Sequence, residues 1–431
     1  MKLAFVNGVI LDGTKDMVPQ ADKVVLVDGE KIKDIINKED ADLNGYEPVD
    51  LKGAYLLPGL INLHGHLSLS GKPPKKEKKK ATDYKKLVKL LTGNALIREV
   101  MKRLLASYAT DELMSGVTTF RVVGGVMDFD GSVRDRINAG KAVGPRILTS
   151  NMAISVPGGH FAGAIATESK DPQEAVEDVK KIAKTNPDLI KLMITGGIMD
   201  ASESGEPGVL RMDPKIVKAA CDQAHEMGYQ VAAHIESPQG VQVGLENGVD
   251  TIEHGAMLND EMIRLFKERN AAHICTISPA IPYSLFDLSE SHALPVAKEN
   301  SDIVLKGIIE CAKTALENGI TVGLGNDAGC PFVTHYGFWR ELCYFHKYVG
   351  ASNNDTLHIA TLGNAQIVKI DDVTGSIEKG KSADMIVVKK DPLKDLSVLS
   401  DVSMVCMKGK LITNPKIKRI PEADRVLDKY M

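Results

Sequence analysis

The chain has 431 residues, with 53 lysines and arginines against 57 aspartates and glutamates, so its formal net charge is −4. This near balance gives no reason to expect nucleic acid or an anionic membrane as a partner. No stretch approaches the roughly 18 uncharged apolar residues of a membrane helix, and no secretory signal pattern is visible. The six cysteines lack Cys-x-x-Cys spacing, so we expect a protein of the reducing cytoplasm that acts on a small molecule.

The two ends of the chain predict β-structure. Residues 3–13 and 23–35 each contain an apolar run, an Asn-Gly or Asp-Gly pair and a second apolar run, which is typical of two strands joined by a tight turn. Residues 382–391 and 402–412 alternate in the manner of strands. We expect residues 1–55 and 366–431 to join into one small β-sandwich.

The middle of the chain, residues 56–365, alternates short apolar strands with amphipathic helices. Helices are predicted at 94–116, 171–186, 213–228, 259–270 and 303–319, and several begin at Asp or Asn and end at Gly. The candidate strands are 54–64, 117–123, 145–150, 189–194, 230–234, 250–254, 272–277 and 321–327. This alternation predicts an α/β fold, a (β/α)8 barrel of the TIM type. A doubly wound open sheet is the competing architecture, but no glycine-rich nucleotide loop follows the first strand.

A lysine-rich segment, Lys72 to Leu91, follows the first candidate strand. Such a run is typical of a solvated loop that leads into a helix. Its position also allows a second interpretation, a mobile flap over the mouth of the barrel.

Residues that could bind metal fall where the candidate strands end. Catalytic groups of a (β/α)8 barrel sit at the C-terminal ends of its strands. His-x-His alone is weak evidence, although residues i and i+2 of an extended chain do point to the same side. The joint pattern is more specific, and its members are His64, His66, His234, His254 and Asp327.

Lys191 lies inside the fourth candidate strand, between apolar residues. Burying a bare ammonium group there is costly unless the group is paired. The lysine therefore either reaches solvent or a salt-bridge partner with its charged end, or is converted by CO2 into a carbamate, an anion that could bridge two metal ions.

Several segments resemble the amidohydrolase superfamily. Residues 56–68, LLPGLINLHGHLS, are similar to its first-strand signature, and residues 375–393 resemble its return to the C-terminal sandwich. The later metal-bearing strands are matched, in order, by IKLMITGG, VAAHIES, GVDTIEHG and GLGNDAG. The closest subgroup is the imidazolonepropionase-like and Xaa-Pro dipeptidase-like hydrolases, and the resemblance covers essentially the whole chain.

The resemblance implies a site for two divalent metal ions. His64, His66, Lys191 and Asp327 would hold one ion, while the Lys191 carbamate with His234 and His254 would hold the other. Nitrogen and oxygen ligands favour zinc and leave manganese, cobalt and iron open. The implied reaction is hydrolysis of the amide bond of a small N-acyl amino acid or dipeptide by a metal-bridging hydroxide. Asp327 would take the proton of the attacking water and pass it to the leaving amine.

Three residues are candidates for contact with the substrate. His160 follows the third strand, where the subgroup has a similar histidine, and Tyr283 lies in the loop after the seventh. Glu236 departs from the resemblance, because dipeptidase-like members often have a small or aromatic residue two positions after the strand-five histidine. Its carboxylate could select a basic or amine-bearing group, or could pair with Arg211 or a lysine.

Two alternatives stay open. One is a mononuclear deaminase or a cyclic-amide hydrolase on the same barrel, for which Lys191 and the placement of Glu236 are atypical. The other is a non-catalytic binding protein, which would predict the loss of at least one ligand residue. The oligomeric state also stays open, although such barrels often dimerise.

Overall fold

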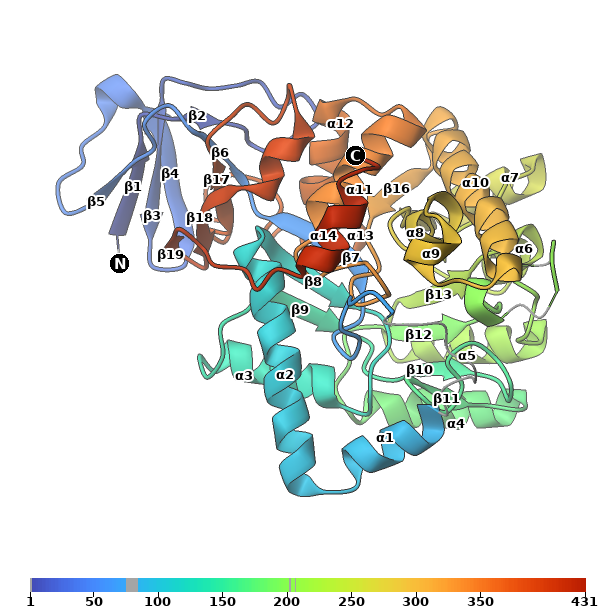
Figure 1. The fold of residues 1–431 in the computed structure, drawn as a ribbon. Helices are drawn as coiled ribbons and strands as arrows, with labels where there is room; N and C mark the ends of the chain where they lie inside the picture. Colours follow the sequence, from blue (N-terminus) through green and yellow to red (C-terminus); the bar gives the residue numbers. More distant parts are fainter. Residues whose placement is uncertain (1, 75–83, 201–202, 206) are drawn as a thin grey trace.

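A β-sandwich and a (β/α)8 barrel make up the computed structural model, which describes residues 2–74, 84–200, 203–205 and 207–431. In Figure 1 the strands of the two chain ends lie together at one end of the molecule, and the barrel with its helices occupies the rest. The predicted fold class is therefore confirmed.

The sandwich consists of two sheets with strand orders β4-β3-β1-β5 and β19-β18-β17-β6-β2. Its core takes residues from both chain ends, for example Phe5, Val25 and Val387. The strands are β1 (Lys2–Val6), β2 (Val9–Ile10), β3 (Lys23–Asp28), β4 (Lys31–Asn37), β5 (Glu47–Asp50), β6 (Tyr55–Pro58), β17 (Met385–Val388), β18 (Val402–Met407) and β19 (Lys410–Thr413).

The two predicted N-terminal hairpins have different outcomes. Asp28 and Lys31 pair across a two-residue turn, so β3 and β4 form a hairpin as expected. The expected hairpin around Asn7 is wrong, because β1 pairs with β3 and β5 whereas β2 pairs with β6 in the other sheet. Gly8 packs so closely on Leu51 that a Cβ atom would lie 2.3 Å from its side chain. The Asn-Gly pair thus moves the chain from one sheet to the other.

The barrel strands run parallel and close between β16 and β7, where Asp327 N donates to His64 O at 2.8 Å. Two short strands together occupy the third position of the barrel. β9 pairs with β8 on one side, and β10 pairs with β12 on the other. The short strand β11 (Ala166–Glu168) pairs with β10. The barrel strands are β7 (Leu60–Gly65), β8 (Val117–Val122), β9 (Arg146–Thr149), β10 (Ala153–Ser155), β12 (Ile190–Met193), β13 (Val231–Ile235), β14 (Thr251–His254), β15 (Ala272–Cys275) and β16 (Thr321–Leu324).

The first candidate strand, residues 54–64, is two strands rather than one. Its first half is β6, which pairs with β17 in the sandwich, and its second half is β7 of the barrel. Gly59 lies between them, against Thr118, where a Cβ atom would meet the threonine side chain at 2.1 Å. This close approach lets the chain pass directly from the sandwich into the barrel.

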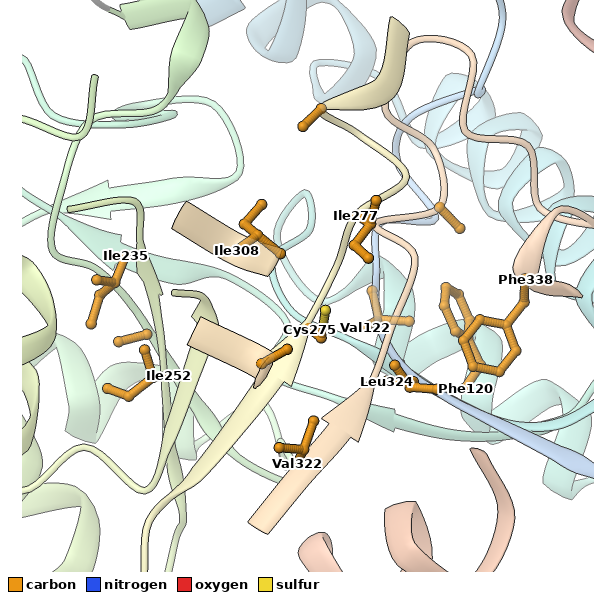
Figure 2. Close-up of a cluster of buried hydrophobic side chains, with 14 of the residues drawn as sticks. Phe120, Val122, Ile235, Ile252, Cys275, Ile277, Ile308, Val322, Leu324 and Phe338 are labelled. Atoms are coloured by element: carbon orange, nitrogen blue, oxygen red, sulfur yellow. The ribbon is translucent and has the colours of Figure 1, made fainter. Parts of the chain in front are cut away.

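The helices cover the barrel and several are capped as the sequence predicts. Asp171 accepts from Glu174 N, and Asp213 accepts from Lys215 N. Figure 2 shows the apolar contact between barrel and helices, with Phe120 of β8 near Phe338 of α11. The helices are α1 (Tyr84–Thr92), α2 (Ala95–Met114), α3 (Phe129–Asn138), α4 (Pro172–Ala183), α5 (Pro214–Glu226), α6 (Pro238–Glu246), α7 (Asp260–Arg269), α8 (Ile281–Leu285), α9 (Leu288–Ser291), α10 (Pro295–Glu317), α11 (Phe338–Tyr344), α12 (Asn353–His358), α13 (Asn364–Ile367) and α14 (Pro421–Leu427).

None of the helices in the described ranges is long and apolar enough to cross a lipid bilayer. Residues 75–83 of the lysine-rich segment lie outside the described residues, so its interpretation as a loop or as a flap over the barrel mouth stays a prediction. The described C-terminal part of that segment, residues 84–91, lies within α1, which is followed by the long helix α2 (Figure 1).

Candidate metal centre

Closure of the barrel brings His64, His66 and Asp327 together, and these three residues are called the first ligand group. His66 N donates to Ala328 O at 2.7 Å, so the end of β7 is tied to the turn that carries Asp327. Asp327 Oδ1 lies 3.2 Å from His66 Nε2 and 3.7 Å from His64 Nε2. A Cβ atom on Gly325 would lie 2.5 Å from His64, so glycine is what permits this approach. These three side chains form a compact group that could hold one metal ion.

A second group lies beside the first and contains His234, Glu236 and His254, whose potential ligand atoms all lie within 4.8 Å of one another. The rings of His234 and His254 have centroids 4.6 Å apart. The His254 ring also lies 4.7 Å from that of His64, which belongs to the first group. Histidines from strands β7, β13 and β14 therefore gather at one end of the barrel.

Each histidine of the two groups has one ring nitrogen engaged by the protein. His64 Nδ1 donates to Glu253 Oε2 at 2.6 Å, and His66 Nδ1 donates to a backbone carbonyl at 2.9 Å. His254 Nδ1 bonds a threonine hydroxyl at 2.7 Å, and His234 Nε2 donates to a carbonyl at 3.3 Å. Partners of this kind orient metal-binding imidazoles and leave the other nitrogen as the ligand.

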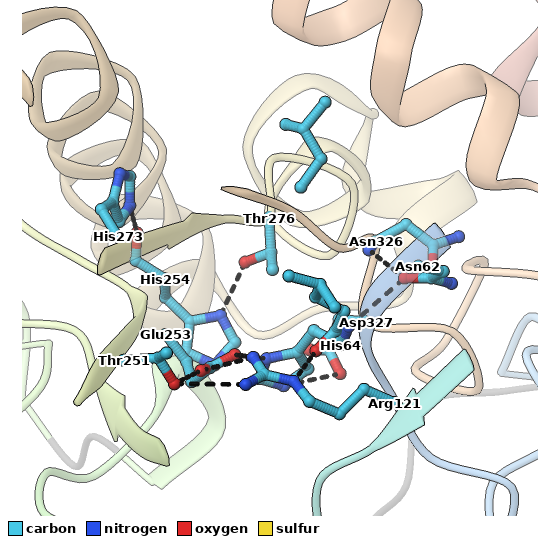
Figure 3. A network of polar contacts seen from close by, with 12 residues as sticks. Asn62, His64, Arg121, Thr251, Glu253, His254, His273, Thr276, Asn326 and Asp327 are labelled. Atoms are coloured by element: carbon cyan, nitrogen blue, oxygen red, sulfur yellow. Dashed lines mark hydrogen bonds and ion pairs between the residues drawn. The ribbon is translucent and has the colours of Figure 1, made fainter. Parts of the chain in front are cut away.

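Glu253 is a buried member of the site that the sequence analysis did not single out. Its carboxylate accepts from Arg121 Nη2 at 2.7 and 2.9 Å and from Thr251 Oγ1 at 2.5 Å, in addition to His64. Figure 3 shows this network beneath His64 and His254. The available signal was an arginine and a glutamate within buried strands, where charged residues are rarely found unless they are paired.

Lys191 lies in β12 with 1% of its surface exposed, and its Nζ atom has no hydrogen-bond partner among the described residues. Burial lowers the pKa of Lys191 to about 8, although the charge of Glu253 acts in the opposite direction. The charge of the Lys191 amine contributes to lowering the pKa of His64, His234 and His254, which are members of the two ligand groups.

Burial also sets the charge states of the candidate ligand residues. It lowers the pKa of His254 to about 3 and holds those of His64 and His234 well below the usual value, so all three are neutral near pH 7. Burial alone would raise the pKa of Asp327, but the contact with His66 and the charges of the nearby histidines lower it. Neutral imidazoles and an ionised carboxylate are the forms that bind metal.

The predicted substrate contacts occupy different surroundings. His160 stacks on His234 with ring centroids 4.1 Å apart, and its Nδ1 donates to Asp200. Burial, with the charges of Asp327 and Asp200, raises the pKa of Glu236 to about 8. Tyr283 is buried in α8 within the main hydrophobic core, and its contact with substrate stays a prediction.

The residues present fit a pair of divalent ions. The donors are imidazole nitrogens and carboxylate oxygens, which suit zinc and related metals. Asp327 Oδ1 and Lys191 Nζ are buried polar atoms without hydrogen-bond partners in the described chain. Such orphaned atoms are uncommon in folded proteins unless an ion, water or ligand completes them.

Comparison with known proteins decides the family, because the model of the Amidohydrolase family matches residues 55–412. The chain belongs to the amidohydrolase family. It is therefore a metal-dependent hydrolase that acts on carbon–nitrogen bonds. Ochratoxinase from Aspergillus niger is 24% identical over 73% of this chain and 69% of its own. Imidazolonepropionase from Fusobacterium nucleatum subsp. nucleatum is 25% identical over 88% of this chain and 86% of its own.

Solved structures of this family superpose over nearly the whole amidohydrolase chain. A candidate prolidase from Bifidobacterium longum is 34% identical, with a TM-score of 0.88 over 100% of this chain and 99% of its own. A Xaa-Pro dipeptidase with methionine bound in its active site is 28% identical, with a TM-score of 0.82 over 96% and 100%.

Proposed function

We propose that this amidohydrolase is a binuclear enzyme that cleaves the amide bond of a small N-acyl amino acid or dipeptide. The observation that carries the proposal is Lys191, a buried amine without a hydrogen-bond partner among the described residues, whose charge acts on histidines of both ligand groups. The similarity to a Xaa-Pro dipeptidase and a candidate prolidase supports the substrate class.

Conversion of Lys191 into a carbamate accounts for its burial. The neutral amine attacks CO2, a carbon–nitrogen bond forms, and one proton leaves to solvent. A cation that is costly to bury becomes an anion with two oxygen donors. One oxygen would join His64, His66 and Asp327 around one ion, and the other would join His234 and His254 around the second.

Two divalent ions bound there would supply Lewis-acid polarisation of the scissile carbonyl and a water activated at neutral pH. The ionised carboxylate of Asp327 would accept the proton of the attacking water and transfer it to the leaving nitrogen. His160, held by Asp200, would contact the substrate from the loop after β10. The stacking of the His160 ring on that of His234, which belongs to the second ligand group, supports this proposed contact.

Metal analysis combined with an amide library tests the proposal. We expect about two ions per chain and hydrolysis of N-acyl amino acids or dipeptides. One ion per chain, with turnover of an amino-heterocycle or lactam and of no open-chain amide, would instead establish the mononuclear alternative. Complete binding of metal with no turnover of any carbon–nitrogen substrate would favour a binding protein.

A further inference from the structure

The carboxylate of Glu236 is held at the mouth of the barrel beside the ligand groups. Its backbone N–H donates to Thr195 Oγ1 at 3.1 Å. Gly208 packs so tightly on its backbone that a Cβ atom there would lie 2.5 Å from the Glu236 carbonyl. The backbone on both sides is thus anchored, so the side chain starts from a defined position just after β13.

One carboxylate oxygen of Glu236 has no hydrogen-bond partner among the described residues. The carboxylate accepts the backbone N–H of Ile198, whereas this oxygen, Oε2, is buried. The carboxylate also lies within 4.8 Å of ligand atoms of His234 and His254. A buried acceptor without a partner is costly, and such an atom at a site is explained by a ligand that donates to it.

The described side chains that act most on the Glu236 carboxyl group offer no cation to this oxygen. The charged groups that act on its carboxylate are Asp327 and Asp200, and both are negative. Arg211, the pairing partner considered from sequence, acts on Asp200 instead. Among the described residues, the charged side chains that act most on this carboxyl group are thus acidic, and a cationic group is the complement that they do not supply.

We propose that Glu236 binds a cationic nitrogen of the substrate, an ammonium or guanidinium group on a residue that the scissile amide joins. The inference rests on the proposed amide hydrolysis and narrows its substrate class to amides that carry a positive charge. The cation has two possible sources, the free α-amine of a dipeptide or the side chain of a basic residue. Both offer N–H donors to an anionic oxygen, and this is the strong form of hydrogen bond.

Two matched pairs of substrates separate the two sources in the zinc-loaded enzyme. In the first pair, alanyl-norleucine and propionyl-norleucine differ only in the α-ammonium group. Acetyl-lysine, modified on its α-amine, against acetyl-norleucine differs in the charged end of the side chain. We expect kcat/KM to favour the cationic member of at least one pair by about 10- to 100-fold, as for a charge-assisted hydrogen bond.

The Glu236→Gln variant keeps the size of the side chain and removes its charge. We expect it to lower kcat/KM for the preferred cationic member at least tenfold more than for its neutral partner. Glu317→Gln, at an exposed glutamate on α10, is the matched control and should keep the wild-type preference. Metal content should stay at the wild-type value, which distinguishes substrate binding from a role of Glu236 as a ligand of the second ion.

Three outcomes would overturn the inference: no charge preference in either pair, an unchanged preference in Glu236→Gln, or loss of one metal ion from that variant. Absence of hydrolysis of all four compounds would contradict the proposed function instead. In that case calorimetric binding of the same four compounds to wild-type and Glu236→Gln holoenzyme decides the inference, by the same comparison within pairs.

Discussion

His64 Nδ1 lies 2.6 Å from Glu253 Oε2, and both side chains are buried inside the barrel. A carboxylate can only accept here, so the ring donates from Nδ1 and presents Nε2 toward Asp327. Arg121 in turn holds Glu253 through two contacts of its Nη2 atom. The chain of contacts fixes the tautomer and orientation of a ligand before any ion binds.

Replacing Glu253 with glutamine should weaken metal binding. The amide is a poorer acceptor for Nδ1–H, and it leaves the buried guanidinium of Arg121 without a counter-charge. We expect metal affinity to fall about 10- to 100-fold, measured by competition with a chelator. Glu112→Gln is the matched control, since Glu112 is equally buried but bonds His335, which is outside both ligand groups. Equal affinity in the two variants would rule out this positioning role.

Lys191→Met should remove the carbamate without unfolding the protein. Methionine fills a similar volume and avoids burial of an unpaired amine, so we expect the metal-free variant to unfold at or above the wild-type temperature. Hydrolysis should fall at least about 100-fold, because loss of the carbamate that would join the two ions also removes the metal-activated water that attacks the amide. A carbon-13 signal from labelled bicarbonate should be present in the wild type and missing in the variant. Full activity in Lys191→Met would contradict the two-metal mechanism.

Asp200→Asn tests the support of His160. The variant removes the negative charge of the carboxylate that accepts from His160 Nδ1. Because Asp200 is partly exposed to solvent, we expect a modest effect. We expect kcat/KM to fall about 3- to 10-fold with unchanged metal content. Contacting residues that act as one unit are not additive, so adding Asp200→Asn to His160→Asn should cause little further loss. Additive losses would mean that the two side chains act independently.

Asp130 makes stability depend on pH. Its two carboxylate oxygens are buried without partners among the described residues, and burial, with the charge of Asp128, raises its pKa from 3.8 to about 8. The folded state therefore holds a proton between about pH 4 and 8 that the unfolded state releases, so stability falls as pH rises through this window. Asp130→Asn should be more stable than the wild type at pH 8 by about 1–3 kcal/mol, with a flatter profile by denaturant unfolding. A variant less stable at pH 8 would contradict this.

The sequence predicts the gathering of His64, His66 and Asp327 because parallel barrel strands all end at the same edge. It does not predict the pairing of Arg121 with Glu253, since that contact depends on how β8 and β14 face one another across the barrel. Local sequence signals for turns and helix starts also mislead where contacts with distant parts of the chain determine the structure. The Asn7-Gly8 pair leads into another sheet, and α10 begins at Pro295 rather than near 303.

The proposed roles of Lys191 and Glu236 depend on groups that the chain alone does not contain. The Lys191 amine and one Glu236 oxygen are buried without hydrogen-bond partners among the described residues. Neither the periodicity of β12 nor the position after β13 specifies a partner for either atom.

Metal stoichiometry, measured together with the carbamate signal, tests the binuclear site most directly. Protein reconstituted with zinc and carbon-13 bicarbonate should hold about two ions per chain, show one labelled carbamate and hydrolyse an open-chain amide. Protein reconstituted without CO2 should hold fewer ions and recover the second on addition of bicarbonate. A fully active enzyme with one ion per chain and no labelled carbamate would contradict the two-metal site and the proposed role of Lys191.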